Sequence, residues 1–144
     1  MRRLTCCLLL ALFGSWLSSF GQSTPQLTSP KIVATFERLG LTNGMKQVTI
    51  YTPPQWGTFR ISVVMVLTAP AGTTGEFWYG YLQFVNAAGV NVYSVALPSK
   101  TLGSAFGELP VRAKAGTPIK FSVQPAGDNS GSKYNVWIVV EQLM

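Results

Sequence analysis

The chain has no histidine, and its 144 residues include only two cysteines and five acidic side chains. Without histidine it lacks the commonest general base and the commonest metal ligand of proteins. Both cysteines, Cys6 and Cys7, lie in an apolar run near the start. The remainder therefore has no thiol for a disulfide, for thiolate catalysis or for a metal site.

The few acids are scattered along the sequence: Glu37, Glu76, Glu108, Asp128 and Glu141. Their spacing matches neither the facing carboxylate pair of a glycosidase nor the alternating oxygen ligands of a calcium loop. No glycine-rich phosphate loop precedes a helix. We therefore expect a protein that is not an enzyme and uses no cofactor or metal. A small hydrolase with an unusual site is the remote alternative.

The first 21 residues have the layout of a secretory signal peptide. Arg2 and Arg3 give a basic start, an apolar run follows to Phe20, and the small residues Ser19 and Gly21 favour cleavage after Gly21. The alternative is a retained anchor, but the run is somewhat short for a membrane span, which needs about 20 residues. No charges follow the run to hold it in place. We expect a secreted, periplasmic or cell-surface protein with no membrane span after cleavage.

Basic residues outnumber acidic ones. Nine of the eleven Lys and Arg residues follow residue 21. All five acidic residues also follow it, so this part of the chain has a net charge of +4. They form no continuous basic run, so nucleic acid is not an expected partner. Arg112, Lys114 and Lys120 are the one cluster, which suits an anionic ligand such as an acidic glycan or a membrane surface. An ordinary solvated face is the alternative.

Strand patterns dominate the rest of the sequence. No stretch has a clear helical period, and glycines and prolines recur every few residues. Residues 22–46 are predicted to be a flexible lead-in, in which 32–38 is either a first strand or a linker. Residues 47–144 are predicted to form the domain, with strands at 47–52, 58–68, 76–85, 90–96, 104–113, 119–123 and 134–141. The fold class is all-β: an antiparallel, jelly-roll-like β-sandwich of seven to ten strands.

Two of these strands are apolar on both faces. Val64 and Val66 lie opposite the face that carries Ile61 and Val63, and Trp137 and Val139 repeat the pattern in the last strand. A sheet with one face in water should alternate apolar with polar residues. We therefore predict that Val64, Val66, Trp137 and Val139 form a contact between copies of the chain. The alternative is that the chain's own loops, or residues 32–38, cover this second face.

Aromatic residues also alternate along residues 77–84. Tyr79 and Tyr81 share a face, and Gly80 lies between them. Trp56 lies in the turn from Pro53 to Gly57. Flat rings can stack on sugars, so Trp56, Tyr79 and Tyr81 are the candidate ligand-binding residues of a monomeric carbohydrate-binding domain. The alternative is that one ring face belongs to the core and the other to a subunit contact.

Three segments together resemble a known class. They are Thr49 to Pro53 with Gly57 to Val63, then Val111 to Val123, and finally Tyr134 to Leu143. They resemble uncharacterised exported bacterial proteins and phage-fibre-like heads, whose architecture is similar to the jelly rolls of the tumour necrosis factor and complement globular-head class. The resemblance implies a jelly roll that is often trimeric, that binds rather than catalyses, and whose last strand lies near the threefold axis. We therefore expect a self-associating binding or surface-structural module with an unknown glycan or surface ligand.

Overall fold

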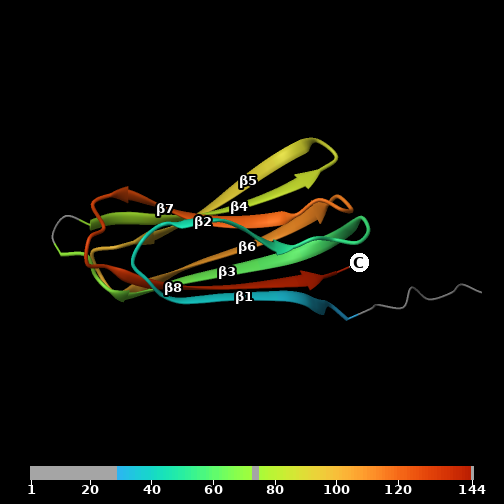
Figure 1. Cartoon of the computed structure of the whole chain (residues 1–144). Helices are drawn as coiled ribbons and strands as arrows, with labels where there is room; N and C mark the ends of the chain where they lie inside the picture. The colour runs from blue at the N-terminus through green and yellow to red at the C-terminus, as the bar shows by residue number, and fades with distance from the viewer. Residues whose placement is uncertain (1–28, 73–74, 144) are drawn as a thin grey trace, which may run out of the picture.

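The computed structural model describes residues 29–72 and 75–143, and the predicted signal peptide lies outside them. The described residues form eight strands and no helix (Figure 1). The strands are β1 (Lys31–Leu41), β2 (Met45–Tyr51), β3 (Gly57–Ala69), β4 (Gly75–Asn86), β5 (Gly89–Pro98), β6 (Gly103–Ala113), β7 (Ile119–Gly127) and β8 (Lys133–Gln142).

The strands form two antiparallel sheets packed face to face. Sheet A has the order β1-β8-β3-β6, and sheet B has the order β2-β7-β4-β5. In Figure 1, sheet B is the upper layer and sheet A the lower one. Chain-neighbouring strands repeatedly change sheet, and the first and last strands pair side by side, which is the connectivity of an eight-stranded jelly roll. The predicted all-β, jelly-roll-like sandwich is confirmed.

Alternation along each strand builds the core between the sheets. In β3, Phe59, Ile61, Val63, Met65 and Leu67 point inward and are at most 2% exposed. Alternate residues of β4, β7 and β8 meet them from the other strands of the sandwich. Each such buried side chain contributes about 1.5–3 kcal/mol relative to exposure. The described residues contain no cysteine, so this apolar layer, and not a disulfide, holds the sandwich together.

The sequence pattern did not decide whether residues 32–38 form a strand or a linker. The structure shows that they form a strand. They form most of β1, which pairs antiparallel with β8 over Lys31–Leu41. The predicted lead-in, residues 22–46, thus contains a strand that belongs to sheet A. The predicted turn at residues 86–89 joins β4 to β5 as a two-residue hairpin closed by the Asn86–Gly89 pair. Pro110 lies in β6 at the edge of sheet A, as its missing N–H predicts.

A buried polar network closes one end of the sandwich. Asn129, in the β7–β8 loop, is 5% exposed. Its Oδ1 accepts hydrogen bonds from Ser99 Oγ at 2.5 Å and Glu76 N at 3.3 Å. Its Nδ2 donates to the carbonyl oxygens of Phe77 at 2.9 Å and Ala126 at 3.2 Å. One side chain of the β7–β8 loop therefore ties together the start of β4, the β5–β6 loop and the end of β7.

Two buried aromatic residues extend this network into the core. Trp78 Nε1 donates to Ser132 Oγ at 3.0 Å, and its rings lie 4.7 Å from the ring of Tyr134. The Tyr134 hydroxyl donates to the carbonyl oxygen of Asn43 at 2.8 Å, and burial raises its pKa well above the ordinary value. Tyr134 is therefore a neutral hydrogen-bond donor at any physiological pH.

Gly80 faces this core rather than an outside neighbour. A Cβ at Gly80 would lie 2.7 Å from Cζ of Phe121 and 2.8 Å from Sδ of Met65. Phe121 is on the adjacent strand β7, and Met65 comes from the opposite sheet. The absence of a side chain at position 80 thus lets the chain's own core pack closely against β4.

Candidate functional site

The outer face of sheet A carries a row of large side chains that crosses all four strands. Glu37 of β1 is opposite Trp137 of β8, Trp137 is opposite Val64 of β3, and Val64 is opposite Phe106 of β6. Val66 and Val139 occupy the neighbouring rows on the same face. The four predicted contact residues are therefore brought together, and Phe106 extends them to the edge of the sheet.

This apolar row is open to solvent. Val64, Val66, Trp137 and Val139 are half-buried, while Phe106 is 64% exposed. The Trp137 indole Nε1 donates a hydrogen bond of 2.9 Å to Glu37 Oε1. This bond satisfies the indole N–H at the surface and fixes the ring beside Val64, so the large apolar face is preorganised.

No described strand covers the outer face. The alternative cover, residues 32–38, lies within the sheet beside β8 and does not cross over it. In Figure 1, sheet A forms the lower boundary of the molecule, with β1 and β8 side by side. Within residues 29–72 and 75–143, no strand therefore crosses over the second apolar face predicted from the sequence.

The other end of the same face is charged. Arg60 Nε donates to Glu141 Oε2 at 2.5 Å, across the β3–β8 pair. The hydrogen bond to Arg60 lowers the pKa of Glu141, and the same bond raises the pKa of Arg60. Glu108 adds a smaller favourable charge beside Arg60. The outer face of sheet A is thus divided into an apolar part and a polar margin that stays ionised at neutral pH.

The candidate sugar-binding residues are divided between two places. Tyr79 and Tyr81 lie on the outer face of sheet B, with ring centroids 6.2 Å apart, and Phe77 continues the series at 5.8 Å from Tyr79. The Tyr79 and Tyr81 rings are stacked, and the Phe77 ring is tilted against that of Tyr79. Trp56 lies in the β2–β3 connection, next to the start of a strand of sheet A. The structure does not combine Trp56 with the two tyrosines.

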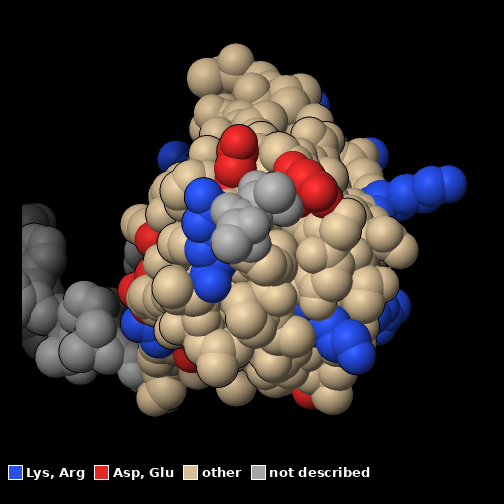
Figure 2. All heavy atoms as spheres, turned by 90° about the vertical axis from the view of Figure 1, so that its left-hand side faces the viewer, with Lys and Arg blue, Asp and Glu red and all other residues tan. Residues whose placement is uncertain are grey.

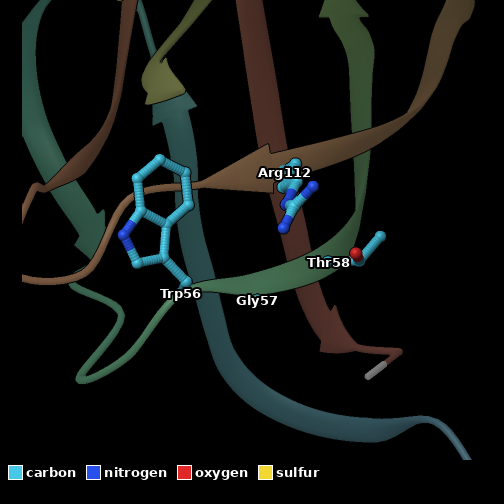
Figure 3. A pocket seen from close by; sticks show the side chains of 4 residues that line it. All are labelled: Trp56, Gly57, Thr58 and Arg112. Atoms are coloured by element: carbon cyan, nitrogen blue, oxygen red, sulfur yellow. The ribbon is translucent and has the colours of Figure 1, made fainter. Parts of the chain in front are cut away.

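Trp56 instead lines a hollow of about 370 Å³ together with Gly57, Thr58 and Arg112 (Figure 3). Thr58 and Arg112 are opposite each other in the β3–β6 pair, and the Trp56 indole lies to one side of the guanidinium. Trp56 is 43% exposed, and Arg112 is also exposed. The hollow therefore offers a flat apolar ring beside a positive charge.

The remaining basic cluster does not continue this hollow as one strand face. Lys114 follows the end of β6, and Lys120 is in β7 of sheet B. Figure 2 shows the other end of the sandwich, on the left of Figure 1, where basic and acidic side chains are interspersed.

No metal-binding cluster is assembled in the described part of the chain. Its residues include no group of three or more His, Cys, Asp or Glu side chains arranged to hold an ion. Within the same residues, no helix has the length and apolarity required to cross a membrane.

Phe106 and Leu39 were not singled out from the sequence. Both are large and exposed, at 64% and 58%, and both belong to the strands that flank the central pair of sheet A. Phe106 stands in a segment with glycine, proline and charges, so its own pattern shows nothing unusual. Only the cross-strand register, which places it opposite Val64, reveals its part in the row.

No protein-family model matches the chain, and no curated protein sequence matches it. Solved structures with a similar fold include the Eiger TNF of S. frugiperda, at 15% identity and a TM-score of 0.46, which covers 79% of this chain and 94% of that one. The capsid asymmetric unit of cyanophage Pam1 has 11% identity and a TM-score of 0.40, covering 89% and 100%.

The infectious bursal disease virus Gx strain structure has 13% identity and a TM-score of 0.41, covering 78% of this chain and 31% of that chain. This chain thus spans about a third of the length of that viral protein. The jelly-roll assignment itself rests on the strand order of the two sheets. The predicted resemblance to jelly-roll proteins of the tumour necrosis factor class agrees with these neighbours.

Proposed function

We propose that the protein is an exported, non-enzymatic binding or surface-structural module that self-associates through the outer face of sheet A. The observation that carries the proposal is the exposed row formed by Trp137, Val64 and Phe106. Large contiguous apolar patches on a folded surface generally mark interaction sites. A second copy of the chain offers a surface of the same composition.

The energy available from this face is substantial. Phe106 is more than half exposed, and Trp137 and Val64 are half-buried. Complete burial of a large apolar side chain contributes about 1.5–3 kcal/mol relative to exposure. The ion pair of Arg60 with Glu141 would lie at the margin of the contact, which matches the apolar centre and polar rim of protein interfaces.

A trimer is the assembly that we favour. The resemblance to the tumour necrosis factor and complement globular-head class implies three subunits with the last strand near the axis. Here the last strand, β8, lies in the interior of sheet A between β1 and β3, and it carries Trp137 and Val139 on the outer face. A contact centred on β8 would therefore bury the apolar row.

Replacing Val64 with glutamate should dissociate this assembly. The carboxylate would lie beside Trp137 and Phe106, and burying it without a partner would cost several kcal/mol. We expect light scattering coupled to size exclusion to show that Val64→Glu lowers the mass of the purified protein threefold.

Ser122→Glu is the matched control for this substitution. Ser122 is also half-buried, in an interior strand of the other sheet, and its side chain is on the outer face of sheet B. This variant should retain the mass of the unaltered protein. A monomer for the unaltered protein at both low and high concentration contradicts the proposal, as does equal dissociation by both variants.

Carbohydrate binding is a second candidate function, favoured by the hollow that holds Trp56 and Arg112. An indole can stack on the C–H face of a sugar, and a guanidinium can bind a carboxylate through two hydrogen bonds. These two groups together select an acidic sugar rather than a neutral one.

Comparing the binding of glucuronate, an acidic sugar, with that of glucose, a neutral one, tests this second candidate function in solution. Trp56 is exposed, so its fluorescence should change when a sugar stacks on it, whereas Trp78 is buried and should not respond. We expect glucuronate to change the emission, and glucose to do so at least tenfold more weakly. Arg112→Gln should abolish the difference and Lys114→Gln should preserve it. Equal responses to both sugars contradict an acidic-sugar site.

A further inference from the structure

The sandwich has four edge strands, and they are not alike. β1 and β6 form the edges of sheet A, and β2 and β5 form the edges of sheet B. An edge strand presents unpaired N–H and C=O groups that can pair with another strand. Proteins usually prevent this with charges, prolines, short strands or bulges. Comparing the edges shows which of them is open to another chain.

Three of the edges are protected. β1 contains Lys31, Glu37 and Arg38 and has two irregularities in its pairing with β8. β2 has only seven residues, carries a lysine and also has two irregularities in register. β6 contains glutamate, arginine and a proline within the strand. Each of these edges combines at least two of the features that oppose pairing.

The fourth edge, β5, has none of these protections within its pairing region. No charged residue occurs between Glu76 and Lys100, so the paired part of the β4–β5 hairpin, from Phe77 to Pro98, is neutral. β5 has ten residues, its register with β4 is regular from Gly89 to Pro98, and its one proline is the last residue. On its outward side it exposes Val90 and Val92, at 63% and 62%.

The backbone of β5 is prepared for pairing on its free side. Because Asn86 and Gly89 close a two-residue hairpin, the N–H and C=O groups of the odd-numbered β5 residues face β4. Those of Val90, Val92, Ser94 and Ala96 face away from it. Among the described residues, only β4 pairs with β5. In Figure 1 the hairpin rises away from the other strands, which leaves the side of β5 accessible.

We propose that the β5 edge pairs with the β5 edge of a second copy of this chain, which joins two B sheets into one continuous antiparallel sheet. The charge pattern favours a second copy as the occupant. Past residue 21 the chain has a net charge of +4, so two copies repel each other at most orientations, but the hairpin is neutral and two hairpins meet without like-charge contact. Antiparallel pairing of identical edges is also self-complementary, as a twofold contact requires.

This contact uses a surface separate from the outer face of sheet A, so it does not depend on the proposed function. Val92 and Ser94 are on the edge of sheet B, whereas Val64 is in the interior of sheet A. Substitutions on one surface should therefore lower the mass of the assembly without affecting the contact made by the other surface.

Ser94→Pro tests the backbone contact, because it removes an N–H that faces the free edge and leaves the N–H groups that bond to β4. Val92→Lys tests the same edge by placing a positive charge on it in both copies. Thr49→Lys on the protected β2 edge of the same sheet is the matched control. We expect both β5 variants to halve the mass measured by light scattering for the purified protein, and Thr49→Lys to leave it unchanged.

Hydrogen exchange provides a second measurement that does not require a variant. The amides of Val92 and Ser94 should be protected at high protein concentration and should exchange at least tenfold faster on dilution. Tyr93 and Val95, which bond to β4, should be protected at both concentrations. An unchanged mass in both β5 variants, or rapid exchange of Val92 and Ser94 at every concentration, overturns the proposal. A mass lowered by Val64→Glu alone would leave the sheet A contact standing and exclude this one.

Discussion

Asn129→Ala should lower the free energy of unfolding by about 3 kcal/mol and the Tm by about 10 °C. The substitution removes four hydrogen bonds and leaves the carbonyl oxygen of Phe77 and the N–H of Glu76 without these partners at a closed end of the sandwich. A buried polar group without a partner costs about 1–3 kcal/mol. Urea unfolding followed by Trp fluorescence measures the change.

Two further variants identify the cause of this loss. Ser130→Ala affects an exposed neighbour in the same loop and should change stability by less than about 0.5 kcal/mol. Asn129→Asp keeps an accepting oxygen but places a carboxylate against the carbonyl oxygens of Phe77 and Ala126, which would raise its pKa in the folded state. The loss in free energy of unfolding caused by Asn129→Asp should therefore become smaller as the pH falls from 7 towards 4. A pH-independent deficit would mean that the amide protons are not what the network requires.

Gly80→Val should destabilise the fold by about 3 kcal/mol, through overpacking rather than through a cavity. Even a single Cβ at this position would lie 2.7 Å from Cζ of Phe121, and that ring has no space to move between the two sheets. Chemical unfolding of the variant measures the cost. Gly103→Ala is the control and should be nearly neutral, because a Cβ at this strand glycine would come no closer than 3.9 Å to the carbonyl oxygen of Thr101.

A double-mutant cycle tests the proposed clash directly. Phe121→Leu removes the atom nearest to the new side chain, so it should cost at least about 1 kcal/mol less in the Gly80→Val background than in the unaltered protein. Additive effects of the two substitutions would show that the strain at position 80 has another source, such as the sulfur of Met65.

The strands were predictable because their signals are local. The alternation of Phe59 to Leu67 and the turn between Asn86 and Gly89 are properties of short segments, and the structure places β3 and the β4–β5 hairpin there. The apolar second face of β3 and β8 was also visible, since Val64 and Trp137 break the expected alternation within their own strands. These two residues prove to be direct cross-strand neighbours.

The composition of each site was not predictable, because it depends on which strands become neighbours. Trp56 lies next to a strand of sheet A, whereas Tyr79 belongs to sheet B. Arg112, which lines the same hollow as Trp56, is far from it in the sequence. Phe106 joins the apolar row only through its register with Val64. The openness of β5 likewise appears only when the strand order shows that it is an edge. Pairing of distant segments determines all three.

The pairing of β1 with β8 has a consequence for the connectivity of the chain. Lys31 is directly opposite Gln142, so the first and last strands begin and end at the same corner of the sandwich (Figure 1). Opposite residues of an antiparallel pair have Cα atoms about 5 Å apart, a gap that a short glycine-rich linker can span. The domain is therefore suited to circular permutation, with new termini in the exposed Ala87–Ala88 turn and the two sheets retained.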